Sequence, residues 1–227
     1  MDVREQPEQG SGMKGRTPYL TPQQSKTVRD WWEALQPRDI DQPKPSAGRF
    51  SFDRGDRARL RRGTNPDDLM LARAAYVLAR ELDRSSVDSD GALADMAEYE
   101  RVAIAAGVLA QVREDAKDGK TLLWHLGLAA TKGADAQPLL NEIRFKRLLK
   151  ASSPADAHMQ LVRAVKIAGN KIDVAQLAND VLALLDQMGS VTVAPARNVK
   201  LHWAHDYYLT AKDQKALATV QDKEPTA

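Results

Sequence analysis

Apolar residues recur along most of the chain at the three- and four-residue spacing that is typical of amphipathic helices. Thr21-Pro22, a favourable cap followed by a favourable first residue, predicts a first helix that ends near Leu35. Further helices are expected over about 53–62, 65–82, 92–114, 121–130, 141–150, 153–168, 173–185 and 198–209. Ser190 to Ala194 is the one short strand candidate, and no second segment matches it. The pattern therefore predicts an all-α protein with eight or nine helices.

Breaks in the helical pattern suggest how the chain is divided. Residues 1–18 are polar and lack periodicity, so we expect a disordered tail there and a second one over 210–227. A weak division near residues 115–120 predicts two small helical bundles that pack together, formed by residues 19–117 and 118–209. The short connections between helices favour antiparallel packing within each bundle.

Composition excludes several classes of protein. The 227 residues include no cysteine, which rules out disulfides, thiolate metal sites and cysteine nucleophiles. No apolar run is long enough to span a membrane and no apolar leader opens the chain, so a cytoplasmic protein is expected. The net charge is only +2, with 33 basic against 31 acidic residues. An electrostatic argument about partners must therefore rest on where the charges lie.

The first concentration of positive charge is the segment Arg49 to Arg62, which holds six arginines and two aspartates. At about 100° per residue, Arg54, Arg57 and Arg61 fall within about 60° on one side of a helix. One interpretation is a solvated face with partial ion pairing, for example between Asp53 and Arg57. The other is a surface that binds the phosphate backbone of a nucleic acid.

The second concentration lies in the helix predicted over 141–150. Phe145, Leu148 and Leu149 occupy one side of this helix, and no acidic residue follows Glu142. The opposite side carries four cations, Arg144, Lys146, Arg147 and Lys150. Favourable interaction with the helix dipole is a structural explanation for cations near the C-terminal end. It explains Arg144 less well, which leaves phosphate binding open.

Evidence for an enzyme is weak. His202, His205 and Asp206 share one side of a helix, as metal ligands could, but two histidines and one carboxylate make a poor site. Asp67-Asp68 suits the first turn of a helix better than a two-metal nuclease. The phosphate-binding, zinc-protease and serine-hydrolase motifs are absent. We therefore expect a protein without catalytic activity, metal or cofactor.

Four motifs resemble those of a known family. Residues 54–62 (RGDRARLRR) are similar to its "RGDRAxLRR" run, and Trp31-Trp32 to its "WWxxL" pattern. Residues 144–149 (RFKRLL) look like its "RFxRLLxA" helix, and residues 203–208 (WAHDYY) like its closing "WAxDYY". The family is CasB, the small subunit of the type I-E CRISPR surveillance complex, Cascade. The resemblance covers roughly residues 25–209.

The resemblance implies an all-helical, non-enzymatic subunit, present in two copies, with other Cascade subunits, guide RNA and target DNA as partners. Such a subunit lines the path of the guide and target strands, helps to hold the opened DNA and lies on no membrane. Carried over to this chain, the candidate nucleic-acid contacts are Arg54, Arg57, Arg61, Arg62, Arg144, Lys146, Arg147 and Lys150. A freestanding helical DNA-binding protein and a protein-interaction scaffold remain the alternatives.

Overall fold

The computed structural model describes residues 16–37, 50–84, 96–128, 137–190 and 192–221, with side chains described as far as Thr210. Within these ranges the chain forms ten α-helices, one 3-10 helix and two very short strands. The helices are α1 (Pro22–Leu35), α2 (Arg54–Arg62), α3 (Pro66–Met70), α4 (Arg73–Arg84), α5 (Met96–Leu109), α6 (Leu122–Gly127), α7 (Glu142–Leu149), α8 (Pro154–Ile167), α9 (Val174–Asp186) and α10 (Val199–Gln221), with η1 (Pro195–Arg197) between the last two. The predicted all-α fold is confirmed.

Side-chain caps fix where most of these helices begin. Thr21 and Gln24 form a capping box at α1, in which each side chain accepts the other residue's backbone N–H, at 3.2 and 2.9 Å. The side chains of Asn65, Asn141, Ser153 and Asp173 accept the corresponding N–H at the starts of α3, α7, α8 and α9. Thr21 thus performs the capping role predicted from the sequence, and these four polar residues do the same for their helices.

Helix ends differ more from the predictions. The single helix expected over 65–82 is wrong, because the chain turns at Leu71 between α3 and α4 and leaves that side chain 85% exposed. Helix α5 ends at Leu109 rather than near residue 114, and α6 ends at Gly127. Helix α10 continues to Gln221, whereas the pattern placed its end near residue 209. The start expected for α5 at residue 92 lies outside the described residues.

The strands lie where the sequence did not suggest them. Glu114–Asp115 (β1) pairs in parallel with Lys171–Ile172 (β2). A tight turn with Gly169 at φ 77° and Asn170 at φ 61° leads from α8 into β2, and positive φ angles suit these two residue types. Ser190 to Ala194 forms no strand in its described residues. The sheet ties the segment after α5 to the start of α9.

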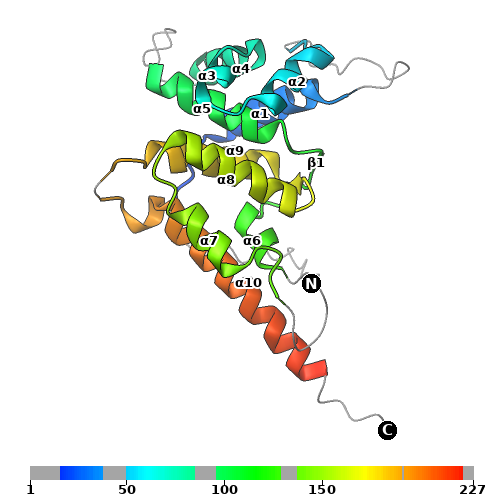
Figure 1. Ribbon diagram of the computed structural model, residues 1–227, viewed down its shortest axis with the longest axis vertical. Helices are drawn as coiled ribbons and strands as arrows, with labels where there is room; N and C mark the ends of the chain where they lie inside the picture. Colours follow the sequence, from blue (N-terminus) through cyan, green and yellow to red (C-terminus); the bar gives the residue numbers. More distant parts are fainter. Residues whose placement is uncertain (1–15, 38–49, 85–95, 129–136, 191, 222–227) are drawn as a thin grey trace, which may run out of the picture.

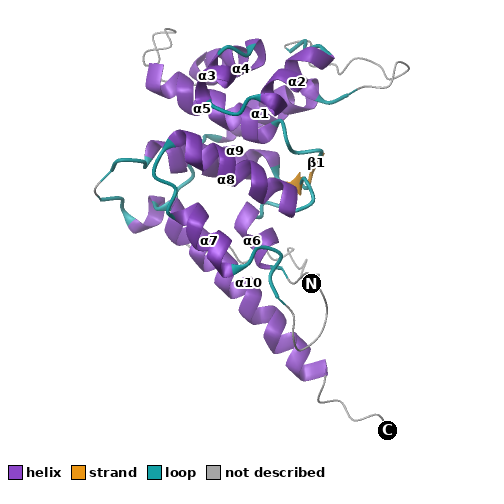
Figure 2. Ribbon diagram, viewed as in Figure 1, coloured by secondary structure: helices purple, strands orange, loops and turns teal. Residues whose placement is uncertain are grey.

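The helices are arranged in layers, as Figures 1 and 2 show. Helices α1 to α5 form one layer, α8 and α9 lie beneath it, and α6, α7 and α10 follow on the other side. Helix α9 packs against α1, α5 and α10, and α8 packs against α5, α6 and α7. Trp31, Ile104, Leu184 and Trp203 all belong to one apolar core, which crosses the boundary expected near residue 117. The division into two bundles stays a prediction.

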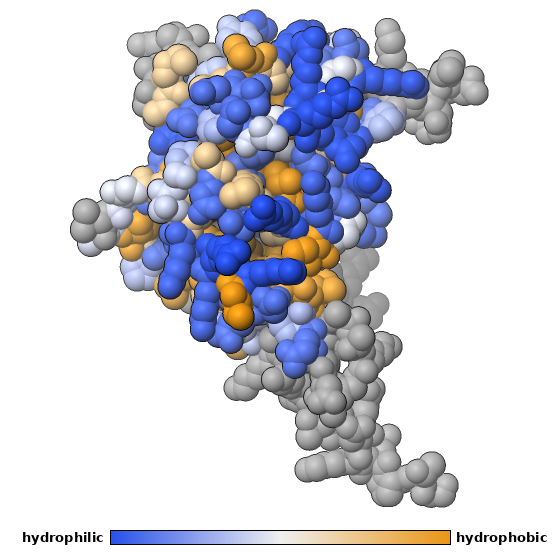
Figure 3. All heavy atoms as spheres, in the orientation of Figure 1, coloured by the Kyte–Doolittle hydropathy of each residue, from blue (hydrophilic) through white to orange (hydrophobic). Residues whose placement is uncertain are grey.

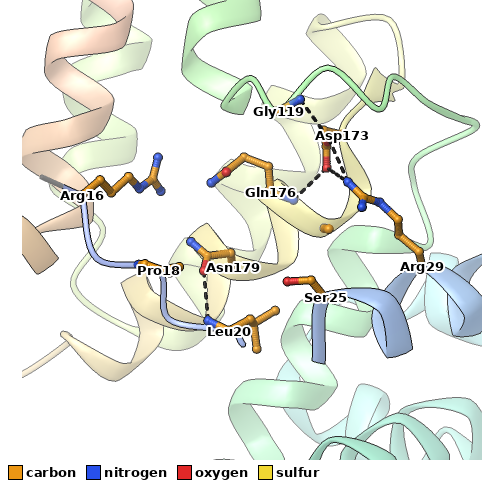
Figure 4. Close-up of a pocket in the computed structure, with 10 residues that line it drawn as sticks. Arg16, Pro18, Leu20, Ser25, Arg29, Gly119, Asp173, Gln176 and Asn179 are labelled. Atoms are coloured by element: carbon orange, nitrogen blue, oxygen red, sulfur yellow. Dashed lines mark hydrogen bonds and ion pairs between the residues drawn. The ribbon is translucent and has the colours of Figure 1, made fainter. Parts of the chain in front are cut away.

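The segment from Arg16 to Leu20 is anchored along α9 (Figure 4). The Asn179 side-chain oxygen accepts the backbone N–H groups of Tyr19 and Leu20 at 2.7 and 3.0 Å. Arg16 pairs with the fully buried carboxylate of Asp180, which also accepts the indole N–H of Trp203 at 2.9 Å. Residues 16–18 are therefore held in place, although the sequence placed them in the tail. Residues 1–15 and 222–227 lie outside the described residues.

Candidate nucleic-acid interface

Helix α7 is held by aromatic residues of α10. The ring of Phe145 stacks on Tyr207 with centroids 4.1 Å apart and an interplanar angle of 11°. The Tyr207 hydroxyl donates to the carbonyl of Leu140 at 2.6 Å, just before α7 begins. The neighbouring Tyr208 hydroxyl donates to the Glu142 carboxylate at 3.0 Å. Two of the motifs noted in the sequence, residues 144–149 and 203–208, thus meet in space and fix the orientation of α7.

With its apolar side buried, α7 presents its cations outward. Arg144, Arg147 and Lys150 are exposed, and none has an ion-pair partner among the described residues. Lys146 differs, because its ammonium group lies 2.8 Å from the Glu142 carboxylate in a pair that is more than half exposed. The hydrogen bond from Lys146 lowers the pKa of Glu142, and the same bond raises the pKa of Lys146. Helix α7 therefore carries three cations without an ion-pair partner among the described residues and one, Lys146, that is paired with Glu142.

Helix α2 is anchored through its first turn. Asp53 and Asp56 form a capping box in which each carboxylate accepts the other residue's backbone N–H, at 2.8 and 3.1 Å. The Asp56 carboxylate also pairs with Arg73 of α4 at 3.0 Å. Asp53 is therefore occupied as the helix cap, and the pair suggested between Asp53 and Arg57 is not formed.

Arg57 occupies a different position from its neighbours on α2. Only 8% of Arg57 is exposed. Arg57 lies three residues before the buried Leu60, so both residues are on the side of α2 that packs against the protein. Its guanidinium donates to the backbone carbonyl of Val112 at 2.9 Å. Burial lowers the pKa of Arg57, and the nearby charges of Arg61 and Arg113 lower it further. Arg57 thus joins α2 to the chain after α5 rather than standing on the outer surface.

The other candidate arginines of α2 stand in solvent. Arg54, Arg61 and Arg62 are exposed, and no carboxylate pairs with them in the part of the chain that the structure describes. Arg113, which the sequence reasoning did not single out, is also exposed and lies close enough to affect Arg57. No local pattern marks Arg113, since its neighbours in space come from a segment some fifty residues earlier.

Figure 1 shows where α2 and α7 lie, and Figure 3 shows the surface over them in the same orientation. On the face drawn there, strongly hydrophilic side chains gather over α2 and again over α7, with some apolar side chains between them. Helix α8 lies between the two regions, and its residues Arg163 and Lys166 are exposed. The structure therefore brings both basic helices to one side of the molecule.

His202 and Asp206, which were considered as metal ligands, are held by contacts within the protein. His202 is buried with one ring nitrogen 3.1 Å from the carbonyl of Ala196, and Asp206 accepts a hydrogen bond from the Thr121 hydroxyl at 2.7 Å. Among the described residues, no three histidine or acidic side chains gather as metal ligands would. No described helix is both long and apolar enough to cross a membrane.

The fold and the site define an all-α protein with two arginine-rich helices turned toward one face. The chain matches the family model described as CRISPR-associated protein Cse2 over residues 56–208, which is more than half of its length. The chain therefore belongs to the Cse2 family, also called CasB, and is a structural subunit of the type I-E CRISPR complex Cascade. Comparison with curated proteins and with solved structures gives no match.

The matched region bears on the motifs singled out in the sequence. It includes both motifs that meet at α7 and all but the first two residues of the arginine run. Trp31 and Trp32 lie outside it, and both are buried. The indole N–H of Trp31 donates to the carbonyl of Ala74 at 2.9 Å, so this part of the resemblance concerns the core of the protein.

Proposed function

We propose that this subunit binds the sugar-phosphate backbones of guide RNA and target DNA within Cascade and stabilises the opened DNA. The surface that does so is formed by the exposed cations of α2 and α7, namely Arg54, Arg61, Arg62, Arg144, Lys146, Arg147 and Lys150. Arg57 positions α2 in this account, because its guanidinium is engaged inside the protein. The subunit takes no part in catalysis, needs no cofactor and acts in the cytoplasm beside a second copy of itself.

The observation that carries the proposal is the lack of carboxylate partners for most of these cations. A surface arginine with a nearby carboxylate has its charge largely compensated, and adjacent arginines without one repel each other until an anion binds. Six of the seven side chains have no ion-pair partner among the described residues. In the view of Figure 3, strongly hydrophilic side chains gather over both helices that carry them. Phosphate groups supply charge of the required sign at regular spacing.

A modest contribution from such contacts is enough for the proposed role. Replacement of a DNA duplex by a guide–target hybrid is nearly balanced in free energy, so small additional terms determine whether the DNA stays open. Contacts to phosphates are independent of sequence, which suits a subunit beside a guide that can have any sequence. Base pairing between guide and target supplies the choice of site.

Charge reversal on α7 tests this proposal. Cascade is reconstituted with the Arg144→Glu/Arg147→Glu subunit, and its composition, its guide RNA content and its affinity for target DNA are measured. We expect a complex of normal composition that binds target DNA more weakly, because two attractive contacts become repulsive. An assembled complex with unchanged DNA affinity would contradict phosphate binding by these cations, whereas failure of the subunit to join the complex would assign them to an acidic protein surface. Cleavage of nucleic acid by the purified subunit with a divalent metal would contradict the non-catalytic role.

A further inference from the structure

A carboxylate inside the protein is paired with an arginine of residues 16–20, the segment before α1 that is called the strap below. Asp180 of α9 has no exposed side-chain surface, whereas its partner Arg16 keeps 21% of its side chain exposed. Three further donors reach this carboxylate, namely the side-chain amides of Gln176 and Asn179, at 2.7 and 3.2 Å, and the indole N–H of Trp203, at 2.9 Å. All three belong to α9 and α10. These two helices therefore build the site that receives the guanidinium, and their hydrogen bonds to the carboxylate do not depend on the strap.

The rest of the strap is attached mainly through its backbone. The N–H of Thr17 donates to the carbonyl of Ala196 at 2.9 Å. One side-chain oxygen, that of Asn179, accepts the two successive backbone N–H groups of Tyr19 and Leu20. Of these three strap residues, only Leu20 is buried. Backbone hydrogen bonds combined with a few inserted side chains are the means by which folded domains hold extended peptides.

Cavities lie along both sides of the strap. One, of about 350 Å³, is lined by the strap, α1 and α9 (Figure 4). The other, of about 520 Å³, is lined by the strap, the end of α9 and the residues that follow it, and Pro18 lines both. A close-packed core leaves few voids larger than a water molecule. The strap therefore rests in a groove rather than forming part of the close-packed core, and it can be lifted out with little loss of packing.

We propose that the groove beside Asp180 is a binding site for an extended peptide segment that carries an arginine. The strap occupies this site as an internal ligand and can leave it without unfolding the protein. A buried carboxylate that already accepts neutral donors selects a guanidinium, because the charge-assisted pair forms away from bulk water. The site uses none of the basic residues of α2 and α7, so the inference does not rest on the proposed function.

Release of the strap can be tested without any substitution, by amide hydrogen exchange of the full chain. The exchange is followed by NMR at urea concentrations below the unfolding transition. We expect the amides of Tyr19 and Leu20 to be protected at least about a hundredfold less than that of Leu182 in the middle of α9. Their protection should hardly depend on urea, because a local opening exposes little surface. Protection equal to that of Leu182, with the same dependence on urea, would show that the strap leaves only on global unfolding and would overturn the proposal.

A peptide added in trans tests what the groove binds. The probe is a fluorescein-labelled peptide with the sequence of residues 14–20, KGRTPYL, and the protein is the full chain with Arg16→Ala. We expect this variant to fold and to bind the peptide saturably, at least about tenfold more tightly than the original chain, whose own strap competes at a high effective concentration. The same peptide with alanine in place of its arginine should bind at least about tenfold more weakly, because the charge-assisted pair is lost.

Arg197→Ala is the matched control for the loss of one positive charge near the strap. Arg197 is exposed, lines the second cavity and has no ion-pair partner among the described residues. This control should bind the peptide no more tightly than the original chain does. Peptide binding that is absent from folded Arg16→Ala, equal in both variants or indifferent to the arginine of the peptide would refute the site. Failure of Arg16→Ala to fold would show that the strap is an integral part of the protein and would also overturn the proposal.

Discussion

The clearest quantitative prediction concerns Arg144 and Arg147 on α7. Both side chains are exposed and lack ion-pair partners among the described residues, so replacement of both by glutamine removes two charges while it breaks no described contact of these side chains. The stability cost should be below about 1 kcal/mol, consisting mainly of a lost interaction between Arg147 and the helix dipole. For a chain of this size, that corresponds to a melting temperature lowered by less than about 4 °C.

The effect on binding is larger and depends on salt. Each phosphate contact adds about 0.7 for a single strand, or about 0.9 for a duplex, to the slope of log affinity against log salt. Loss of two contacts should therefore reduce the slope by about 1.4 to 1.8. When salt is raised from 50 to 200 mM, the affinity of both complexes for DNA should fall. The factor by which it falls should be roughly seven to twelve times smaller for the variant complex than for the original complex.

The assay measures the dissociation constant of reconstituted Cascade for target DNA at several salt concentrations. Lys26→Gln/Lys117→Gln is the control, because it removes the same total charge from exposed residues that pair with acids on α1, Asp30 and Glu33. We expect this control to retain the original slope. An unchanged slope for Arg144→Gln/Arg147→Gln, or an equal change in both variants, would refute local phosphate contacts at α7.

Three further predictions concern the support of the site. A methyl group on Gly127 would come within 2.7 Å of the Tyr207 carbonyl oxygen, so Gly127→Ala should lower the free energy of unfolding by about 1–3 kcal/mol. An unaltered midpoint in chemical denaturation would contradict the close packing of α6 on α10. Tyr207→Phe removes the hydrogen bond to Leu140 and should cost about 1 kcal/mol, whereas Tyr208→Phe, at an exposed residue, should cost less; the reverse order would contradict the anchoring of α7. Burial lowers the pKa of His158 below 6.5, so the unfolded chain binds a proton at this residue more readily than the folded protein does. The free energy of unfolding should therefore fall as the pH drops below about 6.5, by at most about 1.4 kcal/mol per pH unit. His158→Leu should reduce this pH dependence, and a pH profile identical to that of the original protein would assign the effect to other groups.

The orientation of the side chains of α7 was predictable because its apolar and its basic residues follow the same helical spacing on opposite sides. Phe145 and Leu148 recur at the spacing of a buried side, and the cations occupy the remaining positions. Once the cap at Asn141 fixes the start of the helix, the direction of each side chain follows. What the pattern could not supply was the partner, since Tyr207 lies more than sixty residues later in the chain.

Arg57 shows where reasoning from periodicity fails. The pattern placed it with Arg54 and Arg61 on an exposed side, but a long aliphatic stem can be buried while the charged end reaches a carbonyl. That carbonyl belongs to Val112, which is distant in sequence and carries no mark of its role. The break at Leu71 was missed for a related reason: no glycine or proline stands there, and tertiary packing determines the turn.

Whether α2 and α7 face nucleic acid together can be seen in the structure of Cascade assembled with this subunit on target DNA. Cryo-electron microscopy of that complex should show the exposed arginines of both helices within hydrogen-bonding distance of backbone phosphates. Density in which either helix faces only protein or solvent, with no nucleic acid near its guanidinium groups, would contradict the account.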